Sequence, residues 1–112
     1  TGALAEGTLF TFGPDPRNKP TAKSIVEKFK AKGIDPEGYT LYTYASFQIW
    51  SQAAAKAKTT DPKKVMEAIK GGEWDTVLGK LAFDAKGDIK AIDYVVYRWD
   101  AKGNYSEINK GS

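Results

Sequence analysis

The sequence predicts an α/β fold that consists of one strand, three helices and a final group of strands. Three observations support this order: a run of β-branched and aromatic residues at 8–12, three segments with apolar residues at helical spacing, and a turn-rich apolar stretch at 80–108. With 112 residues, 41% of them hydrophobic and 28% charged, the chain is one globular domain or a piece of a larger protein.

The first strand is predicted at Thr8–Phe12. The segment Gly13–Pro16 ends it, because two prolines within three residues exclude both a helix and an inner strand. This stiff connection is either an ordinary loop or a crossing between domains.

The first helix is predicted to begin with Asn18 as its N-cap and to carry Pro20 in its first turn. Its apolar stripe consists of Ala22, Ile25, Val26 and Phe29. Gly33 is suited to the position just beyond the end of the helix, where a left-handed conformation is common.

The second helix is predicted at about Thr40–Lys58 and is apolar on two sides. One side consists of Leu41, Tyr44, Ala45 and Ile49, and the other of Phe47, Trp50, Ala54 and Ala57. A helix of this kind usually lies between two layers, so Tyr44, Phe47 and Trp50 are expected in the core. Tyr39 and Tyr42 fall where turn becomes helix.

The third helix is predicted to begin with Asp61 as its N-cap and Pro62 as its first residue. Gly71-Gly72 is expected to end it. After this helix, the tetrapeptide Asp-Ala-Lys-Gly occurs at 84–87 and again at 100–103, and both copies have the residue types of a turn. Local turn chemistry therefore predicts three strands between Lys80 and Ile108, joined by these two turns.

The stretch Ile92–Trp99 between the two turns is apolar on both faces, so both faces require covering layers. The rest of this short chain offers few residues for two such layers.

The composition excludes several classes of function. The chain has no Cys and no His, so the usual catalytic nucleophile–base pairs and metal ligands are missing. Asp84 and Asp88 bracket a lysine and lack the alternating oxygen ligands of a calcium loop, which favours a turn over a metal site. The net charge of +3 comes from scattered lysines interleaved with acids, which indicates an ordinary solvated surface more than a nucleic-acid site. No apolar run is long enough to span a bilayer.

Six short motifs occur in a characteristic order: Ala5-Glu6-Gly7, Ile25-Val26 through Lys32, Asp35-Pro36 before Thr43-Tyr44-Ala45, Asp75 through Gly79, Phe83-Asp84 through Gly87-Asp88, and a strand ending at Trp99. Together they make the chain resemble the C-terminal part of the branched-chain amino-acid-binding proteins of bacterial ABC importers. These are type I periplasmic binding proteins, which have two α/β lobes joined by three crossing segments. The resemblance covers nearly all 112 residues.

The resemblance implies a division into three parts. Residues 1–14 would be a second-lobe strand and the start of a hinge crossing, residues 15–91 the first-lobe helices and strand, and residues 92–112 a hinge crossing and the C-terminal second-lobe strands. A segment that runs from one lobe into the other has covering layers on both faces, so the resemblance makes Ile92–Trp99 a hinge crossing more than one arm of a hairpin. The chain would be a fragment of an extracytoplasmic solute-binding protein that captures an amino acid, either branched-chain or a similar small acid, for the permease of an ABC importer. No enzyme activity, cofactor or metal is implied. The location would be periplasmic, or extracytoplasmic with a lipid anchor in a Gram-positive bacterium.

In this family an aromatic residue a few positions before the Thr-Tyr-Ala segment walls the ligand's side-chain pocket. That position corresponds best to Tyr39. The family pattern has one more residue between Gly38 and Tyr44, so Tyr42 remains an alternative. Spacing alone favours ordinary surface or half-buried tyrosines over ligand-binding ones. The groups that bind the ligand's amino and carboxylate ends would lie upstream of this region.

A second hypothesis is a free-standing small α/β interaction domain whose aromatic β ribbon binds a protein or a nucleic acid. Under the first hypothesis, the isolated fragment is expected to self-associate or to pair with the missing N-terminal part, because its strand edges and apolar faces lack partners. It is also expected not to bind the ligand tightly on its own.

Overall fold

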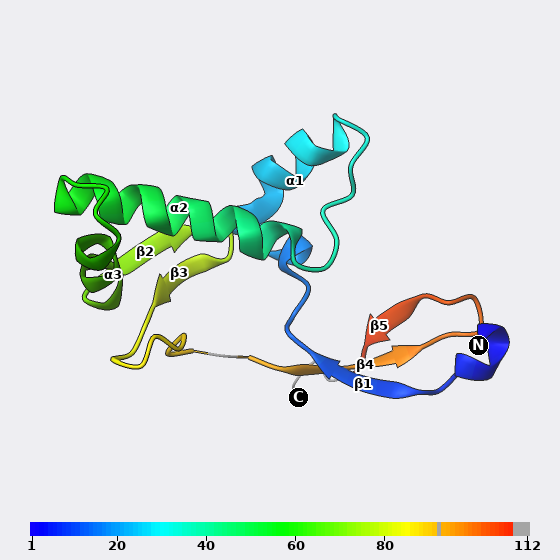
Figure 1. The fold of residues 1–112 in the computed structure, drawn as a ribbon. Helices are drawn as coiled ribbons and strands as arrows, with labels where there is room; N and C mark the ends of the chain where they lie inside the picture. The colour runs from blue at the N-terminus through cyan, green and yellow to red at the C-terminus, as the bar shows by residue number, and fades with distance from the viewer. Residues whose placement is uncertain (92, 109–112) are drawn as a thin grey trace. The chain divides into compact units, whose positions relative to one another are not determined.

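A computed structural model describes residues 1–91 and 93–108 of the chain. The elements follow the order β1, α1, α2, α3, β2, β3, β4 and β5, so the prediction of a mixed α/β fold is confirmed (Figure 1). The chain forms two compact units, one of residues 1–14 together with the segment after Ala91, and the other of residues 15–91. The assignment of these units to the lobes of a larger protein stays a prediction.

The first unit is a three-stranded antiparallel sheet in the order β1–β4–β5. Its strands are β1 (Leu9–Phe12), β4 (Val95–Trp99) and β5 (Tyr105–Glu107), and a short 3-10 helix, η1 (Gly2–Ala5), precedes them. Strand β1 pairs with β4 along its whole length, so the first and last parts of the chain lie side by side.

A cluster of aromatic rings lies on one face of this sheet. Phe10 lies opposite Tyr97, and Trp99 lies opposite Tyr105, so all four side chains point to the same side. Ring centroids lie 5.2–5.5 Å apart, in stacked, tilted and edge-to-face arrangements. The Tyr97 hydroxyl also donates to the Gly13 carbonyl at 3.2 Å. The aromatic side chains of this ribbon therefore pack mainly against one another.

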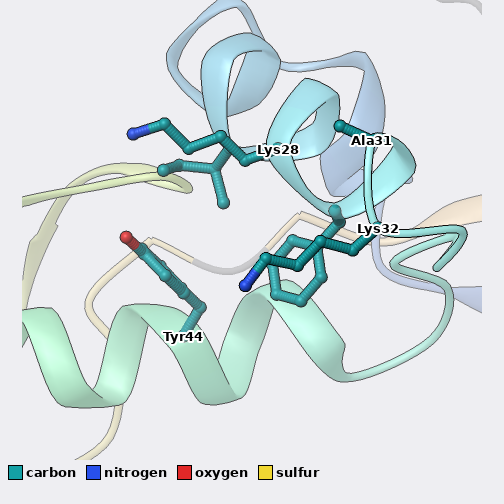
Figure 2. A pocket seen from close by; sticks show the side chains of 6 residues that line it. Lys28, Ala31, Lys32 and Tyr44 are labelled. Atoms are coloured by element: carbon teal, nitrogen blue, oxygen red, sulfur yellow. The ribbon is translucent and has the colours of Figure 1, made fainter.

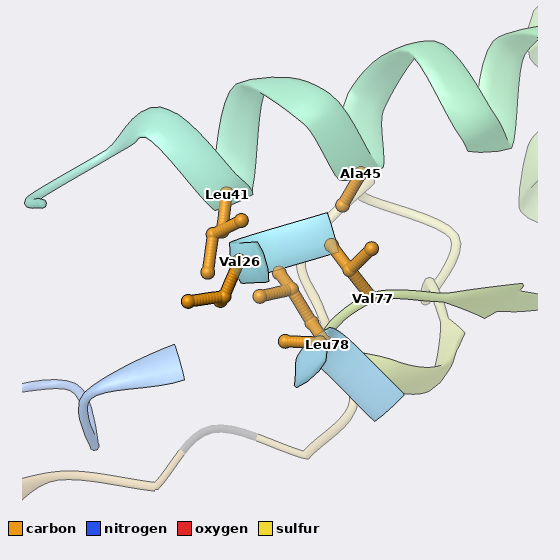
Figure 3. Packing of buried hydrophobic residues seen from close by; sticks show 6 residues of the cluster. Val26, Leu41, Ala45, Val77 and Leu78 are labelled. Carbon is orange, nitrogen blue, oxygen red and sulfur yellow. The ribbon is translucent and has the colours of Figure 1, made fainter. Parts of the chain in front are cut away.

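The second unit contains three helices and a β-hairpin. The helices are α1 (Lys23–Lys30), α2 (Thr40–Ala57) and α3 (Pro62–Lys70), and the hairpin consists of β2 (Glu73–Thr76) and β3 (Gly79–Ala82). Its core has two clusters, which α2 links because residues from both halves of that helix are buried. The first, shown in Figure 3, is Ala22, Val26, Leu41, Ala45, Val77 and Leu78, and the second is Ile49, Ala53, Val65 and Trp74.

The helix boundaries follow from local chemistry in two of the three cases. Helix α2 ends one residue before Lys58, which adopts a left-handed conformation. Helix α3 has the predicted N-cap, because the Asp61 carboxylate accepts hydrogen bonds from the backbone N–H groups of Lys63 and Lys64, and Pro62 is its first residue.

The predicted start of the first helix is wrong. Two 3-10 turns, η2 (Pro16–Asn18) and η3 (Pro20–Ala22), precede α1, and Asp15 caps the first of them in place of Asn18. Pro20 lacks the N–H group that would have continued a helix across these turns. Gly33 has a φ of 74°, as expected beyond the end of a helix.

The prediction that the second apolar side of α2 lies in the core is wrong within the part of the chain that the structure describes. Phe47 and Trp50 are 71% and 45% exposed, whereas Leu41, Ala45, Ile49 and Ala53 are buried. Tyr44 is half-buried and packs against the first core cluster. Helix α2 therefore buries one face only.

Three strands do occur in the predicted region, as β3, β4 and β5, but the prediction that both turns join neighbouring strands of this group is wrong. Strand β3 pairs with β2, and the first Asp-Ala-Lys-Gly turn only brings Ile89 back to a single bridge with Phe83. The second copy does join a hairpin, since β4 pairs with β5 across it. The interpretation of Ile92–Trp99 as a crossing rather than a hairpin arm is therefore wrong for Val95–Trp99, while Ile92 lies outside the described residues.

Candidate functional site

The two tyrosines at the start of α2 form the candidate site. Their ring centroids lie 5.8 Å apart at an interplanar angle of 66°, an edge-to-face contact. Tyr39 is 66% exposed, whereas Tyr42 is half-buried and packs against the first core cluster. The structure therefore brings the two predicted residues into contact, with Tyr39 exposed and Tyr42 packed against the core. Their assignment as ligand-binding residues stays a prediction.

The loop that carries Tyr39 is tightly folded. Pro36 is one of the largest fully buried side chains of the chain. The Asp35 carbonyl accepts from the N–H of Glu37 at 2.8 Å, and the Glu37 carbonyl accepts from both the N–H and the hydroxyl of Thr40. Gly38 has a φ of 55°, which a residue with a side chain adopts only with strain. These contacts hold Tyr39 at a defined place before the helix.

Arg17 ties this loop to the start of the second unit. Its guanidinium group donates to Asp15 at 2.7 Å and to Asp35 at 3.0 Å, and it lies 3.6 Å from Glu37. The Asp15 side chain also accepts from the backbone N–H of Arg17 at 2.9 Å. Arg17 therefore links Asp15 to Asp35 and Glu37, the two acids of the loop that carries Tyr39.

The charges of this cluster reinforce one another. Burial alone would raise the pKa of the Asp15 carboxyl, but hydrogen bonds from Arg17 and its positive charge outweigh burial and lower that pKa below its usual value. Hydrogen bonds to Asp15 and Asp35 raise the pKa of the Arg17 guanidinium in turn. Both groups are therefore held in their charged forms.

Sequence reasoning missed the contribution of Arg17. A signal for it exists, because the dipeptide Asp-Pro occurs at 15–16, next to this arginine, and again at 35–36. Proline after each aspartate restricts the backbone, so both carboxylates are presented at turns. Only the fold, however, brings the two turns to one guanidinium group.

The Asp84–Asp88 loop is a turn in the structure. The Asp84 carboxylate accepts from the N–H groups of Gly87 and Asp88 at 2.8 and 2.9 Å, and the Asp88 carboxylate pairs with Lys86. Across residues 1–91 and 93–108, no group of three or more acids could hold a metal ion. None of the helices described there is long and apolar enough to cross a membrane.

The arrangement presents one exposed aromatic ring on a tightly folded loop, in edge-to-face contact with a half-buried tyrosine that packs on the core. Exposed aromatic rings offer apolar surface for contact.

A family model described as periplasmic binding protein matches residues 1–104 of the chain.

The chain belongs to the periplasmic binding protein family. This confirms the resemblance drawn from the six motifs, and membership implies an extracytoplasmic location. An amino acid binding protein of Pseudomonas aeruginosa is 52% identical over 103 residues, which are 92% of this chain and 28% of that protein. Leu/Ile/Val-binding protein homolog 1 of Brucella suis is 49% identical over 112 residues, 97% of this chain and 30% of that protein.

Solved structures match the fold over almost the whole chain. A leucine binding protein from Thermotoga maritima superposes with a TM-score of 0.75 at 27% identity and covers 94% of this chain and 31% of its own. An ABC transporter substrate-binding protein from Desulfitobacterium hafniense, solved in complex with Leu, gives a TM-score of 0.70 at 27% identity, covering 91% of this chain and 32% of its own. This periplasmic binding protein chain thus spans slightly under a third of the length of these relatives.

Proposed function

We propose that the complete polypeptide captures a branched-chain or similar small amino acid outside the cytoplasm and delivers it to the permease of an ABC importer. The observation that carries this proposal is family membership, together with the names of the relatives that are about half identical to this chain. Family membership also favours small-molecule capture over the alternative of a free-standing interaction domain.

The proposed mechanism is closure of two lobes around the ligand. Residues 1–14 and the segment after Ala91 would belong to the second lobe, and residues 15–91 to the first. Gly13–Pro16 and the segment from 92 to about 95 would be two of the hinge crossings. A ligand that contacts both lobes stabilises the closed state and so shifts the population toward it.

In this mechanism Tyr39 walls the pocket for the ligand's side chain. Support comes from its exposed ring, its fixed loop and the edge-to-face contact with Tyr42. A tyrosine face offers apolar contact to an aliphatic side chain, and the Arg17 cluster would keep that face in place while the lobes move. The amino and carboxylate ends of the ligand would be bound by residues outside these 112.

Other parts of the proposal concern partners and location. The protein would act without catalysis and without a cofactor, in the periplasm or, in a Gram-positive bacterium, attached to the membrane by a lipid anchor. Its macromolecular partner would be the membrane permease rather than a nucleic acid.

Calorimetric titration of the complete protein tests this function. Leucine, isoleucine and valine are expected to bind, and lysine and glutamate serve as charged comparisons. Y39A should weaken leucine binding about tenfold, because one wall of the pocket is lost, and Y39F should stay within about twofold. If no amino acid or small carboxylate gives a heat signal or a thermal shift, the proposed function is wrong. If Tyr42→Ala loses affinity for leucine and Y39A does not, then Tyr42 and not Tyr39 lines the side-chain pocket.

We also propose that the 112-residue chain alone associates, either with itself or with the N-terminal remainder of its protein. Support comes from Phe47 and Trp50, which with Ser46 line an open apolar hollow on α2, and from β1 at the edge of its sheet, where Leu9 is 55% exposed. Light scattering of the isolated chain is expected to show species larger than a monomer. A monodisperse monomer at high concentration would contradict this.

A further inference from the structure

A second hollow lies between the end of α1 and the body of α2, and neither Tyr39 nor Tyr42 lines it. It has a volume of about 430 Å³ and is lined by Ile25, Lys28, Phe29, Ala31, Lys32 and Tyr44. Its size falls in the range of small-molecule sites, roughly 300–1,000 Å³. All six residues belong to the second unit.

The floor of this hollow is apolar and rigid. Phe29 and Tyr44 meet edge to face, with ring centroids 6.3 Å apart, and both pack with Ile25 against the first core cluster. The floor is therefore anchored to buried residues of α1 and α2. A bound apolar group would contact aliphatic and aromatic carbon at once.

The rim is cationic. Lys28 and Lys32 are four residues apart, so they lie on one side of the helix end, and Figure 2 shows both reaching over the space toward which Tyr44 extends from α2. No acid lines the hollow. Within the described residues, neither lysine has a carboxylate within ion-pair distance.

Lysines near a helix C-terminus often serve only to compensate its exposed carbonyl groups. Here three of the carbonyls at this helix end already have backbone partners. The Glu27 and Lys30 carbonyls accept from the N–H groups of Ala31 and Gly33, and the Phe29 carbonyl accepts from those of Lys32 and Ile34. The two ammonium groups are therefore available to an anion.

We propose that this hollow binds an apolar carboxylate, a small molecule with an aliphatic or aromatic body and one negative charge. The body would lie against Ile25, Phe29 and Tyr44, and the carboxylate would lie between Lys28 and Lys32. Ammonium groups suit such a ligand because they act as point charges that do not require the planar geometry of a guanidinium fork. The proposal does not rest on the proposed amino-acid cleft, because neither Tyr39 nor Tyr42 lines this hollow.

The test uses the complete protein, with sodium octanoate as the probe and octan-1-ol as its neutral counterpart. Octanoate is expected to bind at millimolar concentrations and to shift the NMR signals of Ile25 and Ala31. The double variant K28Q/K32Q should weaken octanoate binding about three- to tenfold without changing octanol binding, since each exposed charge contributes modestly. The matched control K23Q/K30Q removes two lysines of α1 that do not line the hollow and should bind octanoate normally.

A31F adds a ring at the exposed mouth of the hollow and should abolish binding of both probes while the fold is kept. Titration with leucine in the same samples separates this site from the amino-acid cleft, because these variants should bind leucine as the wild type does. The proposal is overturned if octanoate leaves the Ile25 and Ala31 signals unchanged, if octanol binds as tightly as octanoate, or if K23Q/K30Q weakens binding as much as K28Q/K32Q does.

Discussion

The side-chain Oε1 of Gln48 accepts a hydrogen bond of 2.9 Å from the backbone N–H of Val77. Val77 is 2% exposed and lies in the turn between β2 and β3. The Thr21 hydroxyl donates to the Val77 carbonyl at 2.8 Å, so two side chains satisfy both polar groups of one buried peptide position. Through Gln48, helix α2 fixes the position of the hairpin.

Replacing Gln48 by Leu should therefore destabilise the protein. The Val77 N–H would stay buried without an acceptor, which costs about 1–3 kcal/mol. Urea unfolding followed by circular dichroism measures the change. Ser51→Ala is the control, because it removes an exposed hydroxyl of the same helix and should change stability by less than about 0.5 kcal/mol. Equal stability of Q48L and wild type would contradict this role of Gln48.

Gly72 should not tolerate a side chain. A Cβ atom there would collide with Cζ2 of Trp74 and lie 2.8 Å from its Cε2, and this ring is 3% exposed. The ring cannot move away freely, because its Nε1 donates to the Ile69 carbonyl at 3.0 Å. We expect G72A to lose about 1–3 kcal/mol of stability and to alter tryptophan fluorescence.

The adjacent Gly71 provides the matched control for that variant. Its φ of −92° suits any residue, and a Cβ atom would meet only the Glu67 carbonyl at an ordinary 3.6 Å. G71A should therefore stay within about 0.5 kcal/mol of wild type. If G71A and G72A are equally destabilised, the cause is the backbone and not the Trp74 ring.

The Asp15–Arg17 pair should make stability depend on acid pH. Because the folded pKa of Asp15 lies below its ordinary value of 3.8, the pair stabilises the fold fully above that value, and the stabilisation is lost as pH falls through the folded pKa. D15N should lose about 0.5–1 kcal/mol at neutral pH, a modest figure because both side chains are about one-fifth exposed.

The difference between D15N and wild type should shrink below about pH 4, as Asp15 becomes protonated in the wild type. Chemical unfolding at a series of pH values measures this. Glu6→Gln removes an exposed carboxyl in the other unit and should show no comparable convergence. A constant difference between D15N and wild type down to the lowest pH would refute the linkage.

The two Asp-Ala-Lys-Gly turns should respond differently to loss of their aspartates. The Asp100 carboxylate accepts from the N–H groups of Lys102 and Asn104, both at 2.8 Å. These hydrogen bonds, and that from Asn104 most of all, lower the pKa of Asp100. D100A should accelerate amide exchange in β5, which depends on this hairpin. D100N, which keeps an acceptor oxygen, should have a smaller effect.

In the first copy, Lys70 of α3 donates to the Ala85 carbonyl at 2.9 Å, so a contact from outside the turn supports it. D84A should therefore affect exchange only within 84–89 and leave β4 and β5 unchanged. Hydrogen-exchange mass spectrometry of the two variants measures both outcomes. Acceleration of β5 exchange in D84A would show that the copies are coupled.

Local chemistry predicted much of this fold. The ends of α2, the Asp61 cap of α3 and both Asp-Ala-Lys-Gly turns depend on residues close in sequence, so their patterns were sufficient. Strand pairing was predicted wrongly because the two Asp-Ala-Lys-Gly turns have the same sequence, but only the second joins two paired strands. Only tertiary structure decides that β4 pairs with β1 while β3 pairs with β2.

The candidate site could be predicted in part. The family resemblance pointed to Tyr39 and Tyr42, and spacing placed them at the entrance of α2, but their contact with each other and the Arg17 cluster require the fold. Periodicity also failed for Phe47 and Trp50, because it shows that a helix has two apolar sides without showing which of them is covered within these 112 residues.

The pairing of β1 with β4 has a consequence for biosynthesis. A ribosome makes β1 first and β4 only after all of residues 15–91, so the strand emerges long before its partner. At about 5–20 residues per second, roughly four to sixteen seconds separate the two. The second unit is continuous in sequence, so all of it is made during that interval. In a cell, chaperones can therefore bind Leu9–Phe12 until β4 has emerged.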